Sequence, residues 1–335
     1  MGQNANPVLA EIWRGDILES VHRGTAVVCT PAGEVVEAWG DPDRVILPRS
    51  ACKMIQALPL VESGAADAAG LAPEHLALAC ASHAGTDRHT GLARKWLAGL
   101  GLGERDLRCG VHAPNDPGTR HALRMAGRAP DQFHNNCSGK HSGFLTANRH
   151  IGGGAEYIDP EHPLQKAVRQ ATEEVTGTGV EGFAIDGCSA PNFAVPIRGL
   201  ATAMARFAAP GASFTGARGA AALRLREAMA AHPELVSGEG RATTELIRAC
   251  RGRAVVKSGA EAVFTAMLPQ RGLGIALKID DGNGRGSQAA MAALLARFGA
   301  LEQSDPAYGD NADAPILNCR GIAHGHIRAA AVLTG

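Results

Sequence analysis

The chain has 335 residues, of which 45% are apolar and 20% are charged, as in a soluble globular protein with one large domain or two packed ones. Its 33 basic and 33 acidic side chains balance, so no basic surface suggests a nucleic acid or membrane partner. The sequence has neither a transmembrane-length apolar stretch nor a secretory signal, and we therefore expect a cytoplasmic protein. In that compartment its eight cysteines are expected to be reduced.

The first hundred residues predict strands followed by helices. Short apolar runs within residues 8–40, with a turn at residues 31–34, predict strands. A helix is expected to begin at Ser50, whose hydroxyl could cap it, and to bend or end at Pro59. An apolar run then leads to Ser82 and His83, and residues 87–100 have the pattern of an amphipathic helix.

The rest of the chain alternates between loops, helices and a late group of strands. Residues 115–118 predict a turn, and the polar residues 134–143 show no periodicity and are expected to form a loop. We expect helices at 163–176, 195–208, 217–231, 242–251 and 286–298, and strands at 183–185, 254–257, 262–268 and 273–278.

The order of these elements predicts an α/β (α+β) fold. Strands at both ends of the chain suggest one sheet built from about residues 8–48 and 253–335. A mostly helical and loop insertion is expected between them, from about 50 to 250. We interpret residues 1–335 as a single catalytic domain.

Two lysine-bearing motifs indicate the chemistry. Ser50 and Lys53 form an S-x-x-K motif, and on one helix they share a face, so the lysine amine can act as base toward the serine oxygen. Lys257-Ser258-Gly259 matches K-[ST]-G, in which the cation can stabilise negative charge and the glycine allows close approach. Serine β-lactamases and penicillin-binding proteins use this pair of motifs for acyl transfer. Alone, each motif also fits a capping serine or an ordinary strand end, whereas the ordered pair indicates an amidase.

Three further groups have both functional and structural interpretations. Ser82 could relay a proton to a leaving amine, or it could cap a helix beside a buried His83. Cys137 and Cys188, with a lysine or histidine from the 137–141 segment, could hold zinc and leave a position open, or they could be buried reduced thiols. We assign the remaining cysteines to packing: Cys29, Cys52, Cys80, Cys109, Cys250 and Cys319.

Five landmarks together resemble the bacterial asparaginase II family, the Rhizobium etli-type or class 3 L-asparaginases. They are residues 49–53 with 56–59, then 81–83, 135–141, 186–188 and 257–261, so that the resemblance covers nearly the whole chain. The resemblance implies a fold related to serine β-lactamases and glutaminases. It also implies hydrolysis of L-asparagine to L-aspartate and ammonia, and a homodimer.

The resemblance also implies roles for individual residues. Two Ser–Lys tandems fall on Ser50 with Lys53 and on Ser82 with Lys257. A zinc site that supports substrate binding without supplying the nucleophile falls on Cys137, Lys140 and Cys188. In some relatives, a Gly-Arg dipeptide comes before the strand that carries the lysine equivalent to Lys257, and a cysteine follows it closely. Here the sequence reads Gly240-Arg241-Ala242-Thr243, and no such role is expected.

The expected mechanism begins with attack of Ser50 on the side-chain amide carbon, with Lys53 as base. Backbone N–H groups of Ser50 and of the segment after Lys257 are expected to hold the oxyanion. Ser82, linked to Lys257, passes a proton to ammonia, and water hydrolyses the acyl-enzyme. Four residues are assigned to substrate binding: Arg49 for the α-carboxylate, Asp186 and Glu261 for the α-ammonium group, and His141.

Two other functions stay open at this point. One is a glutaminase, or another Ser/Lys amidohydrolase such as a β-lactam-reactive acyl transferase. The other is a non-catalytic zinc-binding or effector-sensing protein. The sequence does not set a preference between asparagine and glutamine, since one methylene is worth only about 1–3 kcal/mol.

Overall fold

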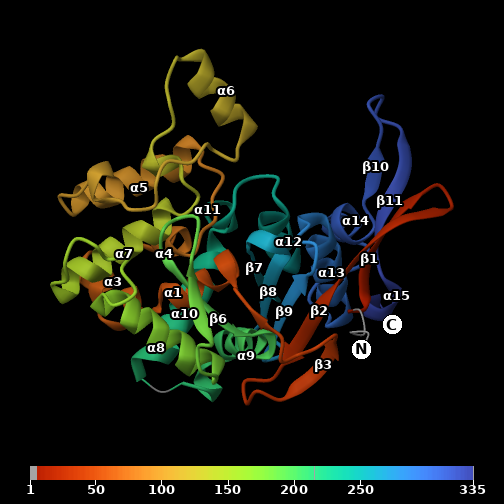
Figure 1. Cartoon of the computed structure of the whole chain (residues 1–335), viewed down its shortest axis with the longest axis horizontal. Helices are drawn as coiled ribbons and strands as arrows, with labels where there is room; N and C mark the ends of the chain where they lie inside the picture. The colour runs from red at the N-terminus through yellow and green to blue at the C-terminus, as the bar shows by residue number, and fades with distance from the viewer. Residues whose placement is uncertain (1–5, 215, 335) are drawn as a thin grey trace.

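The computed structural model describes residues 6–214 and 216–334, and it has the mixed α/β architecture that the sequence predicts (Figure 1). Its main sheet has eight antiparallel strands in the order β10-β11-β1-β2-β9-β8-β7, with β3 also pairing with β2. The strands are β1 (Val8–Arg14), β2 (Ile17–Cys29), β3 (Val35–Trp39), β7 (Val255–Ser258), β8 (Val263–Leu268), β9 (Leu273–Ile279), β10 (Pro315–Leu317) and β11 (Ala323–Ala329). The sheet therefore joins the two ends of the chain.

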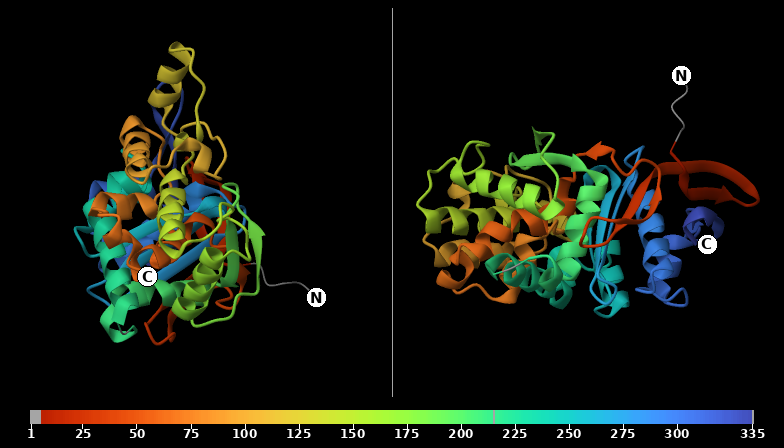
Figure 2. Two further views of the ribbon diagram at one scale, coloured as in Figure 1. Left: turned by 90° about the vertical axis from the view of Figure 1, so that its left-hand side faces the viewer. Right: turned by 90° about the horizontal axis from the view of Figure 1, so that it is seen from below.

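Helices cover both faces of this sheet. Helix α9 (Ile197–Ala208) lies on one face and α13 (Gly284–Arg297) on the other (Figure 2). Burial from both sides explains why all six residues of β8 are buried, and why this strand is almost continuously apolar. The small helices α14 (Pro306–Ala312) and α15 (Ala331–Thr334) pack against α13.

Residues between the two groups of strands form a helical layer beside the sheet (Figure 1). Its helices are α1 (Lys53–Gln56), α2 (Leu58–Glu62), α3 (Ala65–Ala68), α4 (Pro73–Ala79), α5 (Asp87–Gly99), α6 (Pro117–Met125), α7 (Ser138–Ile151), α8 (Pro163–Thr176), α10 (Gly216–Ala231), α11 (Pro233–Val236) and α12 (Ala242–Cys250). A small sheet, in the order β4 (Val45–Ile46), β6 (Pro191–Pro196) and β5 (Gly182–Ile185), accompanies them.

The helix expected from Ser50 begins differently from the prediction. A 3₁₀ turn, η1 (Arg49–Cys52), comes first, and α1 follows it. Pro48 occupies the capping position and no side chain caps the turn, so Ser50 is not a cap. Arg49 has a φ of 52°, a left-handed conformation that is costly for a residue with a Cβ and tends to occur at functional sites.

Two segments predicted as loop and turn belong to helices. Most of residues 134–143 lies in or directly before α7, whose first eleven residues are all buried. A helix buried on every side has no polar face, and its sequence therefore shows no amphipathic period. The predicted turn at 115–118 is the start of α6, where the Asp116 carboxylate caps the helix by accepting the Thr119 N–H at 2.6 Å.

The sequence analysis did not predict β10, β11, α6 or α14. Within the described residues, none of the helices combines the length and the apolar character that crossing a bilayer requires.

Candidate active site

Four segments meet at the candidate active site: η1, the end of β7, the loop after α4 and the start of α7. Thr265 on β8 connects two of them, since its hydroxyl contacts the carbonyl oxygens of Ala51 at 3.0 Å and Lys257 at 3.2 Å. Thr265 is also the direct partner of Lys257 in the antiparallel register. The sheet thus fixes the distance between the S-x-x-K turn and the K-S-G strand.

Gly259 allows this contact. A Cβ at this position would lie 2.9 Å from both the Ala51 nitrogen and the Pro48 carbonyl oxygen, and these backbone atoms have little room to move. The close approach expected at this glycine is, in the structure, that of the chain's own η1 turn. The glycine of the K-S-G motif therefore brings the two motifs together.

Ser82 lies between the two tandem lysines. Its hydroxyl oxygen is 3.2 Å from the Nζ of Lys53 and 2.8 Å from the Nζ of Lys257. Both lysines are only 1% exposed. The structure therefore pairs Ser82 with Lys257, and it joins Lys53 to the same serine.

Lys257 has a strongly shifted pKa. Burial and, next, the positive charge of Lys53 hold the pKa of Lys257 well below its ordinary value. Its amine also contacts the carbonyl oxygen of Ser258 at 2.6 Å. A neutral amine in this position can accept a proton near neutral pH.

Lys53 lies among acceptors. Its Nζ contacts the carbonyl oxygens of Ala81 and Asn136 and is 3.2 Å from the Cys137 sulfur, in addition to Ser82. Such surroundings suit an ammonium group, which has three donors and no acceptor.

Within the described residues, no hydrogen bond joins Lys53 to Ser50. Ser50 is half-buried in the η1 turn. Its proposed role as nucleophile therefore stays a prediction.

Arg49 and Asp186, which we expected to bind opposite ends of the substrate, pair with each other. The Arg49 guanidinium donates to one Asp186 carboxylate oxygen at 2.8 and 3.1 Å. Although burial opposes the shift, Asp186 raises the pKa of Arg49, with a smaller contribution from Glu261. Asn192 on β6 holds the Arg49 backbone by accepting its N–H at 3.1 Å. This pair therefore fixes the strained residue before Ser50.

The proposed zinc residues lie together in the interior. The Lys140 ammonium is 3.0 Å from the Cys188 sulfur, and Cys137 and Cys188 are buried. The neighbouring Cys137 thiol and the Lys140 charge hold the pKa of Cys188 below its ordinary value. Burial opposes the shift of Lys140, but the sulfurs of Cys188 and Cys137 raise its pKa. The Lys140 ammonium and the Cys188 sulfur thus stabilise each other.

The donor set of this cluster suits zinc. Among the residues that the structure describes, no three His, Cys, Asp or Glu side chains are arranged to hold a metal ion. With Cys137 and Cys188, Lys140 would be the third donor, and it would bind as a neutral amine. Two soft sulfurs and one nitrogen are donors that zinc accepts.

The two remaining predicted substrate residues have different settings. His141 is fully buried, with its Nδ1 atom 2.8 Å from the Tyr157 hydroxyl and its Nε2 atom without a partner in the described part of the chain. Burial lowers the pKa of His141. Glu261 is exposed and has a φ of 57° in the turn after β7. The structure thus places His141 beside the cysteine cluster and Glu261 at the surface.

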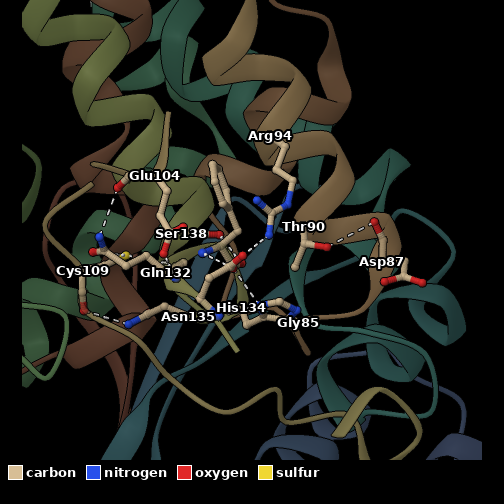
Figure 3. A network of polar contacts seen from close by, with 12 residues as sticks. Gly85, Asp87, Thr90, Arg94, Glu104, Cys109, Gln132, His134, Asn135 and Ser138 are labelled. Carbon is tan, nitrogen blue, oxygen red and sulfur yellow. Dashed lines mark hydrogen bonds and ion pairs between the residues drawn. The ribbon is translucent and has the colours of Figure 1, made fainter. Parts of the chain in front are cut away.

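A polar network holds the segment that carries Cys137 (Figure 3). The Asn135 side chain donates to the carbonyl oxygen of Cys109 at 2.8 Å and accepts the Cys137 N–H at 2.9 Å. Ser138 bonds to the carbonyl oxygen of Phe133 and to His83, both at 2.9 Å. These contacts orient the start of α7 toward Lys53.

A family model described as L-asparaginase II matches residues 10–329. The chain belongs to the L-asparaginase II family. Its members are amidohydrolases, and the protein is therefore an enzyme that hydrolyses an amide bond of a small-molecule substrate. A comparison with curated proteins found no match.

Solved structures with some similarity include a β-lactamase from Mycobacterium bovis, at 16% identity and a TM-score of 0.45, over 82% of this chain and 94% of that one. They also include Mglu in its tris and glutamate form, at 16% identity and a TM-score of 0.43, over 90% of this chain and 64% of that one. Mglu in another structure gives 17% identity and a TM-score of 0.43, over 84% and 68% of the two chains.

The sequence analysis missed Asn192 and Thr265, which hold η1 through side chain–backbone contacts. It also assigned no role to Arg241, a largely buried arginine before α12. The first two belong to strands far along the chain from Ser50, so their role depends on tertiary contacts. Arg241 had one signal, its place in the Gly-Arg sequence that comes before α12 and the K-S-G strand.

Proposed function

We propose that this amidohydrolase is an L-asparaginase that forms an aspartyl ester on Ser50. The observation that supports the proposal is the Ser82 hydroxyl held between Lys53 and Lys257, two buried amines beside the strained turn that carries Ser50. This arrangement provides a path for a proton between two amines. The description of the family, L-asparaginase II, favours the same substrate.

Ser82 acts as the proton relay. It gives its proton to the neutral amine of Lys257 and accepts one from the Lys53 ammonium, so that Lys53 becomes the free amine. Lys53 then takes the proton of Ser50 as the serine oxygen attacks the side-chain amide carbon. The reverse relay returns a proton to the amide nitrogen, the C–N bond breaks and ammonia leaves. Water then cleaves the ester and restores Ser50.

Backbone amides hold the oxyanion in this proposal. The Gly259 N–H already donates to the Val263 carbonyl oxygen at 2.7 Å. We therefore assign the oxyanion to the N–H of Ser50 and to an amide after Gly259.

Zinc is a further part of the proposal. Cys137, Cys188 and Lys140 would hold the ion, which would help to bind the substrate beside Ser50. In every step above, protons move through Ser82 and the two tandem lysines.

Ammonia release tests the function. Purified protein should release ammonia from L-asparagine faster than from L-glutamine at equal concentrations. A faster reaction with glutamine would make the protein a glutaminase, and no release from either would contradict both functions.

Ser50→Ala tests the nucleophile. The variant should keep its fold and lose activity by about 10⁴-fold or more, because the hydroxyl that forms the ester in the proposed mechanism is removed. In the wild type, mass spectrometry of protein quenched during turnover should find an aspartyl adduct on the peptide that contains Ser50. An adduct on Ser82, or a Ser50→Ala variant that keeps more than a few per cent of the activity, would contradict this role.

A further inference from the structure

Arg241 is a largely buried cation for which the described residues provide no counter-ion. Its Nη1 atom is closed off from solvent and has no hydrogen-bond partner in the described part of the chain. Burial lowers the pKa of Arg241, and no carboxylate among these residues raises it. An unpaired buried charge is costly, so an anion that pairs with Arg241 would be bound favourably.

Hydrogen bonds place Arg241 at the edge of the candidate site. The Ser82 N–H donates to the Val236 carbonyl oxygen at 2.9 Å, and Thr243 is 2.9 Å from the Ser258 hydroxyl. Arg241 comes between these two anchored residues, at the start of α12, which lies beside β7 (Figure 1). The segment is thus held between the Ser82 loop and the K-S-G strand.

The charge of Arg241 affects the pKa values of two residues at the candidate site, Lys257 and His83. Burial and Lys53 lower the pKa of Lys257 most, and Arg241 adds to that shift. Burial and nearby cations lower the pKa of His83, and Arg241 is again among them. The guanidinium therefore lies within electrostatic reach of the proton relay.

Arg49 is a poorer candidate for binding a substrate anion. It already forms two hydrogen bonds with Asp186, and a substrate carboxylate would have to compete with that carboxylate. A guanidinium without a partner can take a carboxylate in a two-pronged arrangement at no such cost.

We propose that Arg241, rather than Arg49, binds the α-carboxylate of the substrate amino acid. The proposal rests on the amidohydrolase function above and adds the group that restricts the enzyme to α-amino acid amides. Every substrate must then form one ion pair, between its α-carboxylate and the Arg241 guanidinium.

A second location for an anion has to be considered. Arg241 also lines a pocket of about 640 Å³ between α12 and α14. The other cations of that pocket already have acidic neighbours. Arg248 is 2.6 Å from Glu239, and Arg251 is 3.9 Å from Asp305. Only Arg241 lacks a pair there among the described residues, so the test must separate an anion in this pocket from one beside Ser50.

The test compares two amides, L-asparagine and β-alaninamide, which keeps the amide and the amine but lacks the α-carboxylate. The wild type should strongly prefer asparagine. Arg241→Met should lower kcat/KM for asparagine by about 10²-fold, mostly through KM. It should lower kcat/KM for β-alaninamide far less, and only through kcat, because Lys257 loses one of the charges that lower its pKa. Arg241→Lys should recover part of the loss. Arg248→Met, on the same helix but in an exposed ion pair, is the matched control and should change neither value.

Several outcomes would overturn the proposal. They are an equal loss on both amides, which would indicate a structural role, and an unchanged preference in Arg241→Met. Calorimetric titration with L-aspartate gives a readout that needs no turnover: binding should be present in the wild type and lost in Arg241→Met. Absence of binding in the wild type would overturn the proposal, as would sulfate binding at Arg241 that aspartate does not compete with. If aspartate binds through Arg241 but no amide is hydrolysed, only the proposed function fails.

Discussion

Lys140 and Lys257 are both buried but have pKa values shifted in opposite directions. Lys140 lies against the Cys188 sulfur, and negative charge raises its pKa. Lys257 lies near Lys53, and burial together with that positive charge lowers its pKa. The sign of the nearest charge thus separates a lysine that is held as an ammonium beside a sulfur from one that can act as a base. Zinc binding at Lys140 would have to displace that proton.

Lys257→Met should lower kcat by about 10²–10⁴-fold, because the relay loses its proton acceptor. In the wild type, activity should fall as pH falls through the depressed pKa of Lys257, since the protonated amine accepts no proton from Ser82. Steady-state rates measured from acid to alkaline pH check both expectations. A pH-independent rate, with chemistry limiting, would argue against Lys257 as the acceptor.

The same residue should affect stability. Because the folded pKa of Lys257 is lowered, the unfolded chain binds more protons than the folded one between that pKa and about 10.4, and stability falls as pH falls through this window. Calorimetric melting from pH 7 to 10 should therefore show a flatter dependence of Tm on pH in Lys257→Met. Lys95→Met, at an exposed position on α5, should keep the wild-type slope. Equal slopes in all three proteins would contradict this linkage.

At the scale of elements, the contact between β7 and η1 matters more than either motif alone. The S-x-x-K turn and the K-S-G strand are about two hundred residues apart in the sequence, and they meet because β7 is the edge strand of the sheet next to β8. Residue Thr265 of β8 holds both. The main sheet is thus the scaffold of the site.

Gly259→Ala should disturb this contact. The added Cβ would press on the backbone of η1, which should lower stability by about 1–3 kcal/mol and kcat by about 10²-fold through displacement of Ser50. Gly91→Ala in α5 is the control, because nothing lies within 4 Å of its added Cβ, and it should stabilise the helix by up to about 1 kcal/mol. If Gly259→Ala keeps full activity and the wild-type Tm, close packing at Gly259 is not required.

At the scale of the whole molecule, one measurement can test both the homodimer and the zinc site that the family resemblance implies. Native mass spectrometry of protein purified without chelator should give a mass near twice the 34.6 kDa of the chain and about one zinc per chain. Cys137→Ala should lose the zinc and raise KM more than it lowers kcat. Cys319→Ala, at an exposed cysteine, should keep the zinc and the wild-type KM.

Two results of that measurement would reject these expectations separately. A mass of a single chain would reject the dimer. Less than about a tenth of an equivalent of zinc, with Cys137→Ala fully active at low substrate, would identify Cys137 and Cys188 as buried thiols stabilised by Lys140.

Local patterns in the sequence determined much of this protein. Apolar runs and turn residues predicted most strands and the helices near 163–176, 195–208 and 242–251. These elements are readable because their apolar residues recur with the period of a strand or a helix. The spacing of Ser50, Lys53 and Lys257 indicated amide chemistry. Helix α7 was missed, since its first eleven residues are all buried and a segment without a polar face has no period to detect.

Tertiary structure alone decided the electrostatics of the site. Which lysine loses its proton, whether Arg49 is free or paired with Asp186, and whether Arg241 has a counter-ion all depend on which charges come within a few ångströms of one another. Those distances are set by the sheet and by burial, and burial also weakens the screening that water would provide. Residue types could therefore indicate the reaction, whereas the fold determines which groups are protonated and which charges are paired.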